Sequence, residues 1–144
     1  MTSKTTGELM KLLSSVKNIS ELKQYTNTLS NDGLSITFPE YINKQMLLHH
    51  MTASQLIADA GLQRNYGYQI LDGRRNPSRD KVIALCLALS LNLSDTGRAL
   101  TLTKNGQLYS KNKRDSILIF ALEKKLSVMD TNELLQEMSE PPLS

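Results

Sequence analysis

Apolar residues recur every three to four positions along most of the chain, which is the spacing of an amphipathic helix. The first such stretch follows a capping pair at Thr5 and Glu8, and Gly33 closes the second. An alternation of apolar and polar residues, typical of an extended connector, then falls on Leu34, Ile36 and Phe38. We therefore expect residues 1–38 to form a helical N-terminal extension that ends in an extended connector.

The middle of the chain, residues 39–106, has the pattern of five short helices. Pro39 suits the first turn of the first helix, residues 64–71 form the third, and residues 79–89 form the fourth. The caps and stops that separate these helices are Thr52, Gly61, Gly73, Ser78, Ser94 and the pair Asn105-Gly106. The positions that face the core in this pattern are Leu56, Ile57, Ala60, Val82, Ile83, Leu85, Cys86 and Leu89.

Two more helices are expected in residues 107–144, a helical C-terminal extension. Asp115 would cap the first, over residues 117–126, and Asp130 the second. The first is apolar on more than one face, so it must be buried. Either a second copy of the chain or the chain's own core could cover it. We expect a second copy of the chain to cover it, in a symmetric homodimer.

The composition narrows the class of protein. A chain of 144 residues, 40% apolar and 22% charged, fits one soluble globular domain with a small extension. Two Phe, five Tyr and no Trp leave a largely aliphatic core, which favours helices. The one cysteine, Cys86, excludes a disulfide framework and a multi-cysteine metal site. No apolar run reaches the roughly 18 residues of a membrane span, and we expect a cytoplasmic protein.

The charge is distributed unevenly along the chain. Residues 46–114 carry ten basic and four acidic side chains, a net charge of +6, whereas residues 115–144 carry two basic and six acidic ones, a net charge of −4. A basic middle beside an acidic end indicates a polyanionic partner for the middle segment.

Within this basic segment, residues 52–76 have the pattern of a helix-turn-helix, two short helices joined by a glycine turn. The residues that would hold the two helices at a fixed angle are Leu56, Ala60, Leu62 and Ile70. The second helix turns polar side chains outward, where they could form hydrogen bonds to the edges of bases.

Residues 41–102 resemble the phage-repressor-like family of helix-turn-helix regulators, of the Cro and xenobiotic-response-element type. The resemblance rests on Leu56-Ile57-x-x-x-Gly61-Leu62 in the turn and on Ile70-x-x-Gly73-x-Arg75-x-Pro77-Ser78 after the second helix. It implies an all-α fold, a five-helix repressor-like helix-turn-helix core with helical N- and C-terminal extensions. The resemblance thus implies that residues 39–106 are the DNA-binding domain.

The resemblance also implies where the chain would touch double-stranded DNA. The residues at the start and on the outward face of the second motif helix, which read bases in this family, are Gln63, Arg64, Asn65, Tyr68 and Gln69. Guanidinium groups pair bidentately with guanine and amides with adenine. The residues expected to contact phosphates are Thr52, Arg74, Arg75 and Lys81.

The chain departs from the family pattern at three positions, with Ala53 in place of glutamine, Gly67 in place of a branched apolar residue and Leu71 in place of glutamate. A glycine inside a helix costs about 1 kcal/mol relative to alanine. Gly67 therefore either softens the recognition helix or lets Tyr66 or Tyr68 pack closely.

Other chemistry finds little support in the sequence. His49 and His50 are adjacent, so on a helix they point about 100° apart, and we interpret them as a helix end and not as metal ligands. Cys86 is interpreted as a small core residue. No phosphate-cradling loop, nucleophile elbow or paired-carboxylate motif is present, so we expect neither an enzyme nor a cofactor.

These observations predict a sequence-specific DNA-binding regulator of transcription, a repressor that acts by occupying its operator. The alternative is an antitoxin or adaptor whose helical extensions bind a protein partner, with the helix-turn-helix reduced to autoregulation or to a scaffold.

Overall fold

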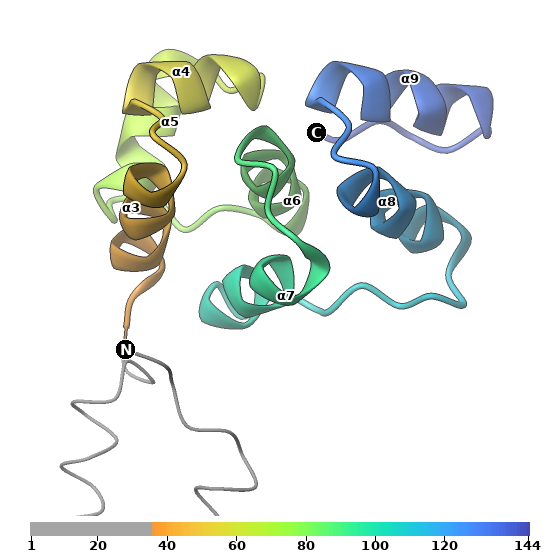
Figure 1. Ribbon diagram of the computed structural model, residues 1–144, viewed down its shortest axis with the longest axis horizontal. Coiled ribbons are helices and arrows are strands. Elements are labelled where there is room, and N and C mark those ends of the chain that lie inside the picture. Colours follow the sequence, from red (N-terminus) through yellow and green to blue (C-terminus); the bar gives the residue numbers. More distant parts are fainter. Residues whose placement is uncertain (1–35) are drawn as a thin grey trace, which may run out of the picture. The chain divides into compact units, whose positions relative to one another are not determined.

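A computed structural model describes residues 36–144. All regular secondary structure in these residues is helical, and they contain no strand. Seven helices follow one another along these residues (Figure 1): α3 (Phe38–Leu48), α4 (Ala53–Asp59), α5 (Arg64–Leu71), α6 (Arg79–Ala88), α7 (Leu93–Leu102), α8 (Lys113–Glu123) and α9 (Val128–Glu137). The two helices predicted for the N-terminal extension lie outside the described residues.

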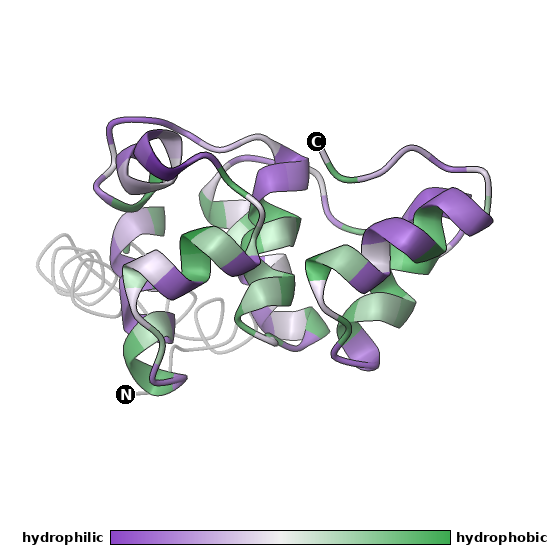
Figure 2. Cartoon of the chain, turned by 90° about the horizontal axis from the view of Figure 1, so that it is seen from above, coloured by the Kyte–Doolittle hydropathy of each residue, from purple (hydrophilic) through white to green (hydrophobic). Residues whose placement is uncertain are grey.

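The core is organised around α6, which lies between the group α3–α5 and the pair α8–α9 (Figure 1). Every side chain from Val82 to Leu87 is buried. A helix that is apolar on all sides needs neighbours on all sides, and α4, α7, α8 and α9 supply them. Apolar residues accordingly lie on the inner faces of the helices and polar residues outside (Figure 2).

The local rules placed the two motif helices correctly. Helix α5 spans the predicted residues, and Thr52 caps α4 through a hydrogen bond from the backbone N–H of Gln55. Gly61 and Gly73 end their helices with φ of +71° and +88°, the left-handed region in which glycine is favoured. Ser78 stands at the cap of α6 as predicted, although its hydroxyl makes no capping hydrogen bond.

Three other predicted caps are wrong. Asn92, and not Ser94, caps α7, while Asp115 and Asp130 are not caps but third residues of their helices. The backbone N–H of each of these two aspartates donates to the true cap, Asn112 for Asp115 and Ser127 for Asp130. An aspartate suits both a cap and a first helical turn, where it faces the positive end of the helix dipole, and this ambiguity caused the error.

Phe38 is also placed differently from the prediction. It does not belong to an extended connector but begins α3, where its side chain is buried. Thr37 caps this helix by accepting a hydrogen bond from the backbone N–H of Glu40. The alternation of apolar residues suggested an extended segment that includes Phe38, whereas the helix already begins at this residue, directly after its cap.

Helices α8 and α9 pack against α6, so the chain's own core covers the apolar C-terminal extension. Leu118, Leu122 and Leu135 are fully buried in this packing, whereas Phe120 remains 47% exposed on the outer side of α8. Of the two burial partners that the sequence left open, the core is the one that the structure shows. The expected homodimer remains a prediction.

Candidate nucleic-acid interface

Helices α4 and α5 pack together across the Gly61 turn, and α5 also contacts α3. Leu56, Ala60 and Ile70 are buried between them as predicted, and Leu62 is half-buried. Because these side chains fill the angle between the helices, the side of α5 that faces away from them is held in a fixed position.

Gly67 has a structural role that neither sequence interpretation anticipated. It is buried in the middle of α5, and a Cβ atom built there would lie 2.6 to 2.9 Å from three side-chain carbons of Ile57 in α4. Isoleucine is branched at Cβ and has few rotamers, so it cannot readily move aside. The glycine therefore lets the two motif helices approach closely.

The side of α5 opposite this contact carries the residues that were predicted to read bases. Asn65 and Gln69 are four residues apart, on the side of the helix opposite the buried Gly67 and Leu71. Asn65 is exposed and Gln69 is half-buried.

The start of α5 carries the other three residues of that set. Arg64 is exposed and its guanidinium carbon lies 6.0 Å from the ring centre of Tyr68, which is half-buried. The side-chain oxygen of Gln63 caps α5 by accepting from the backbone N–H of Tyr66 at 2.8 Å. Gln63 can therefore offer its amide N–H groups to a ligand while its oxygen is occupied.

The arginines expected at phosphates differ in how far they are engaged. Arg74 forms an exposed ion pair with Asp72, with 2.6 Å between nitrogen and oxygen, and hydrogen bonds from Arg74 hold the pKa of Asp72 below its usual value. Arg75 instead donates from its side-chain Nε to the side-chain oxygen of Gln69 at 3.0 Å. Nothing among the described residues occupies its terminal nitrogens.

Thr52 and Lys81, the other expected phosphate contacts, lie at the edges of the motif. The hydroxyl and backbone N–H of Thr52 both bond to Gln55 in a capping box, so Thr52 is at least a structural residue. Lys81 lines a small hollow together with Gly61 and Leu62 of the turn, and its ammonium group lies 6.0 Å from the ring centre of Tyr66.

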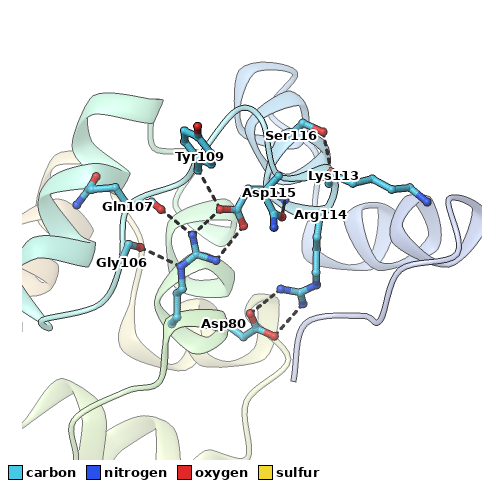
Figure 3. A network of polar contacts seen from close by, with 10 residues as sticks. Asp80, Gly106, Gln107, Tyr109, Lys113, Arg114, Asp115 and Ser116 are labelled. Carbon is cyan, nitrogen blue, oxygen red and sulfur yellow. Dashed lines mark hydrogen bonds and ion pairs between the residues drawn. The ribbon is translucent and has the colours of Figure 1, made fainter.

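Sequence reasoning missed two ion pairs between the first turns of α6 and α8 (Figure 3). Arg79 donates to both carboxylate oxygens of Asp115 at 2.9 and 2.8 Å, and Arg114 does the same to Asp80 at 3.0 and 2.9 Å. Arg79, one of the ten basic residues of the segment 46–114, is therefore already paired. One signal was available, because the first turn of each helix contains the dipeptide Arg-Asp and the two dipeptides pair reciprocally.

The pairs are partly buried and change the acidity of both carboxylates. The hydrogen bonds from Arg79 lower the pKa of Asp115 against the opposing effect of burial. For Asp80, burial acts to raise the pKa, but the hydrogen bonds from Arg114 and from the backbone N–H of Ser144 outweigh it, so that the pKa falls below its usual value. Both carboxylates are thus held in their ionised form.

No other chemistry is assembled in residues 36–144. These residues hold no cluster of three or more His, Cys, Asp or Glu side chains suited to a metal ion. His49 caps the C-terminus of α3 and His50 follows it in the left-handed region. Cys86 is fully buried, and burial raises the pKa of its thiol to about 12. Among the helices described here, none has the length and apolar character to cross a membrane.

Comparison of the chain with models of known protein families, with curated proteins and with solved structures finds no match.

Proposed function

We propose that this chain binds double-stranded DNA through α4 and α5 and regulates transcription, as a repressor that occupies its operator. In this proposal, helices α3 to α7 correspond to the five-helix core of the phage-repressor-like family. Helix α5 enters the major groove, and α4 crosses the backbone above it.

One observation carries the proposal: α5 is packed against α4 on one side and presents polar residues on the other. The packing contact is that of Gly67 with Ile57, the opposite side carries Asn65 and Gln69, and the exposed Arg64 stands at the start of the helix. Base readout needs donors and acceptors on a helix that does not shift when it meets the groove. The α4–α5 pair meets both requirements.

The charge of this surface supports the same conclusion. Helix α5 carries no acidic residue, and Arg64 and Arg75 have no acidic partner among the described residues. Free arginines beside a polar helix attract phosphates and account for much of the affinity of a protein for DNA.

The alternative function, a protein-binding antitoxin or adaptor, has one observation in its favour. The C-terminal extension leaves Phe120 47% and Met129 73% exposed on α8 and α9. Exposed apolar side chains of this size suit a protein interface. A partner bound there would be compatible with DNA binding at α5, because the two surfaces lie on different helices.

Selection of bound sequences from a random duplex pool tests the proposed function. We expect enrichment of one motif, and Arg64→Ala should weaken binding to the selected duplex by about 1 to 3 kcal/mol while largely sparing random duplex. Gln69→Ala should act in the same way at another base pair.

The matched control is Lys111→Ala, which removes one exposed positive charge from the loop between α7 and α8, far from α5 (Figure 1). Equal losses for Arg64→Ala and Lys111→Ala would mean that Arg64 contributes only charge. A pool that enriches no sequence would refute the proposed function and favour the protein-binding alternative.

A further inference from the structure

Arg75 is attached to the recognition helix α5 by two hydrogen bonds to a single residue. Its backbone N–H donates to the carbonyl oxygen of Gln69 at 3.1 Å, and its side-chain Nε donates to the side-chain oxygen of Gln69 at 3.0 Å. The neighbouring Arg74 makes neither contact, because its side chain is turned to Asp72. The two adjacent arginines therefore occupy different chemical environments.

The hydrogen bonds determine which groups this pair of side chains can still offer. Glutamine has one acceptor oxygen with two lone pairs and one amide nitrogen with two donors. In Gln69 the bond from Arg75 engages one of the two lone pairs, whereas both amide N–H donors remain available to a ligand. The terminal nitrogens of Arg75 add further donors beside it, without a partner among residues 36–144.

The edges of the bases differ in what they require from such a surface. Adenine presents one acceptor and one donor in the major groove, and an unengaged glutamine matches both. Guanine presents two acceptors, N7 and O6, and needs two donors. Gln69 with its oxygen bonded to Arg75, together with the Nη groups of Arg75, offers more donors than acceptors.

Building on the proposed function, we propose that Gln69 and Arg75 act as one unit that selects guanine, with Arg75 both orienting the Gln69 amide and supplying the second donor. Arg75 is then a specificity-determining residue, and not one of the phosphate contacts among which the sequence pattern places it. The centre of α5 would then read guanine. A glutamine at this position would not by itself indicate which base is read.

The test is selection from a random duplex pool with the full chain and its variants. The base pair whose preference disappears in Gln69→Ala identifies the position that Gln69 reads. We expect guanine at this position, and we expect Arg75→Ala to lose preference at the same position. Discrimination of guanine from adenine there should fall roughly 5- to 150-fold, the range that corresponds to one bidentate pair.

Two further variants separate orientation from charge. Arg75→Lys keeps the charge but lacks the planar fork, so it should lose the same discrimination while retaining affinity for random duplex. Arg74→Ala removes the neighbouring arginine and should leave the guanine preference intact. Melting curves of all variants show whether each one is folded.

Three outcomes would overturn the inference. The first is adenine at the position that Gln69 reads. The second is an Arg75→Ala variant that binds all duplexes more weakly by the same factor, with the magnitude of its salt slope reduced by about one and restored in Arg75→Lys, because this behaviour identifies a phosphate contact. The third is a wild-type pool that enriches nothing, which would refute the proposed function itself.

Discussion

Two regions of this chain carry arginines near acidic residues, but the arginines are engaged to different degrees in the two regions. Around α5, Arg64 and Arg75 are exposed and keep donors free, and Arg74 pairs with Asp72 in an ion pair whose side chains are 66% and 44% exposed. At the junction of α6 and α8, the two arginine–aspartate pairs have side chains at most 28% exposed.

The difference shows that the basic character of a segment does not by itself indicate a binding surface. The arginines of both regions lie in residues 46–114, the segment with a net charge of +6, and in both regions an aspartate stands within two residues of an arginine. At the junction the guanidinium groups are consumed by bidentate bonds that hold two helices together, so they are unavailable to phosphates. Near α5, Arg64 and Arg75 remain available, and Arg74 is held only by an exposed pair. The following experiments test this division of roles.

Removal of the C-terminal helices should have the largest effect. A chain that ends after Arg114 loses the buried side chains of Leu118, Leu122 and Leu135 and the partner of Arg79. Replacing one such leucine by alanine typically costs about 2 to 5 kcal/mol, and whole domains are stable by only about 5 to 15 kcal/mol. We expect the truncated chain to lose its cooperative thermal transition in circular dichroism.

Phe120→Ala serves as the control for a dimer role of the same extension. Its side chain is 47% exposed, so the substitution should barely lower the melting temperature. If α8 also forms the expected homodimer, sedimentation should show more monomer for this variant. A truncated chain that melts like the full one would contradict the packing of α8 and α9 on the core.

Asp115→Ala should have the next largest effect, because the partly buried Arg79 loses the carboxylate that accepts two hydrogen bonds from it. Breaking such a pair typically costs about 3 to 5 kcal/mol. Stability should also depend on pH in a defined direction. The pKa values of Asp80 and Asp115 are lowered in the folded chain, so their contribution is complete above the ordinary carboxyl pKa and is lost as the pH falls through the lowered values.

Chemical denaturation at several pH values measures this contribution. The free energy of unfolding should be nearly constant around neutrality and should fall below roughly pH 4. Asp115→Ala should flatten the acid branch of the curve. Asp72→Ala, which breaks the exposed pair with Arg74, should change the acid branch much less, because solvent screens this pair. An equal loss for the two variants would contradict the distinction between the two regions.

The sequence predicted the region of α4 and α5 better than the junction of α6 and α8. The bounds and caps of α4 and α5 were predictable because they depend on neighbouring residues, such as Thr52 with Gln55 and the glycine at Gly61. The ion pairs of Arg79 and Arg114 were not, since their partners lie about 35 residues away and depend on how α8 packs. The residue types and helix positions of the candidate base-reading side chains could be predicted from the sequence. Which of their donors and acceptors are already engaged in hydrogen bonds could not.

Gly67→Ala should destabilise the motif moderately. The added methyl group would overlap with Ile57, and overpacking of this kind typically costs about 1 to 3 kcal/mol, while alanine regains about 1 kcal/mol of helix propensity. We expect a net loss of about 1 kcal/mol in the free energy of unfolding. In an Ile57→Ala background the overlap is gone, and the same substitution should become neutral or stabilising.

Gly97→Ala is the matched control for this experiment. Gly97 also lies inside a helix, but the atom that its added Cβ would meet is the side-chain oxygen of Gln107, which can rotate away. This substitution should therefore be tolerated. If Gly67→Ala were equally well tolerated in the wild-type background, Gly67 would not be what allows the close approach of α4 and α5.

The smallest effect concerns Arg74, whose exposed pair with Asp72 lies beside α5. Asp72→Asn should leave the melting temperature unchanged, because exposed pairs contribute little to stability. It should, however, free Arg74 to contact a phosphate, so that selected and random duplexes bind more tightly by the same factor. The slope of log affinity against log salt should become steeper by about one.

Asp59→Asn makes the same change in net charge on α4 without releasing an arginine, since no basic residue among those described pairs with Asp59. A steeper slope in both variants would mean that net charge alone is responsible, whereas a steeper slope in Asp72→Asn alone would show that Asp72 holds Arg74 away from DNA.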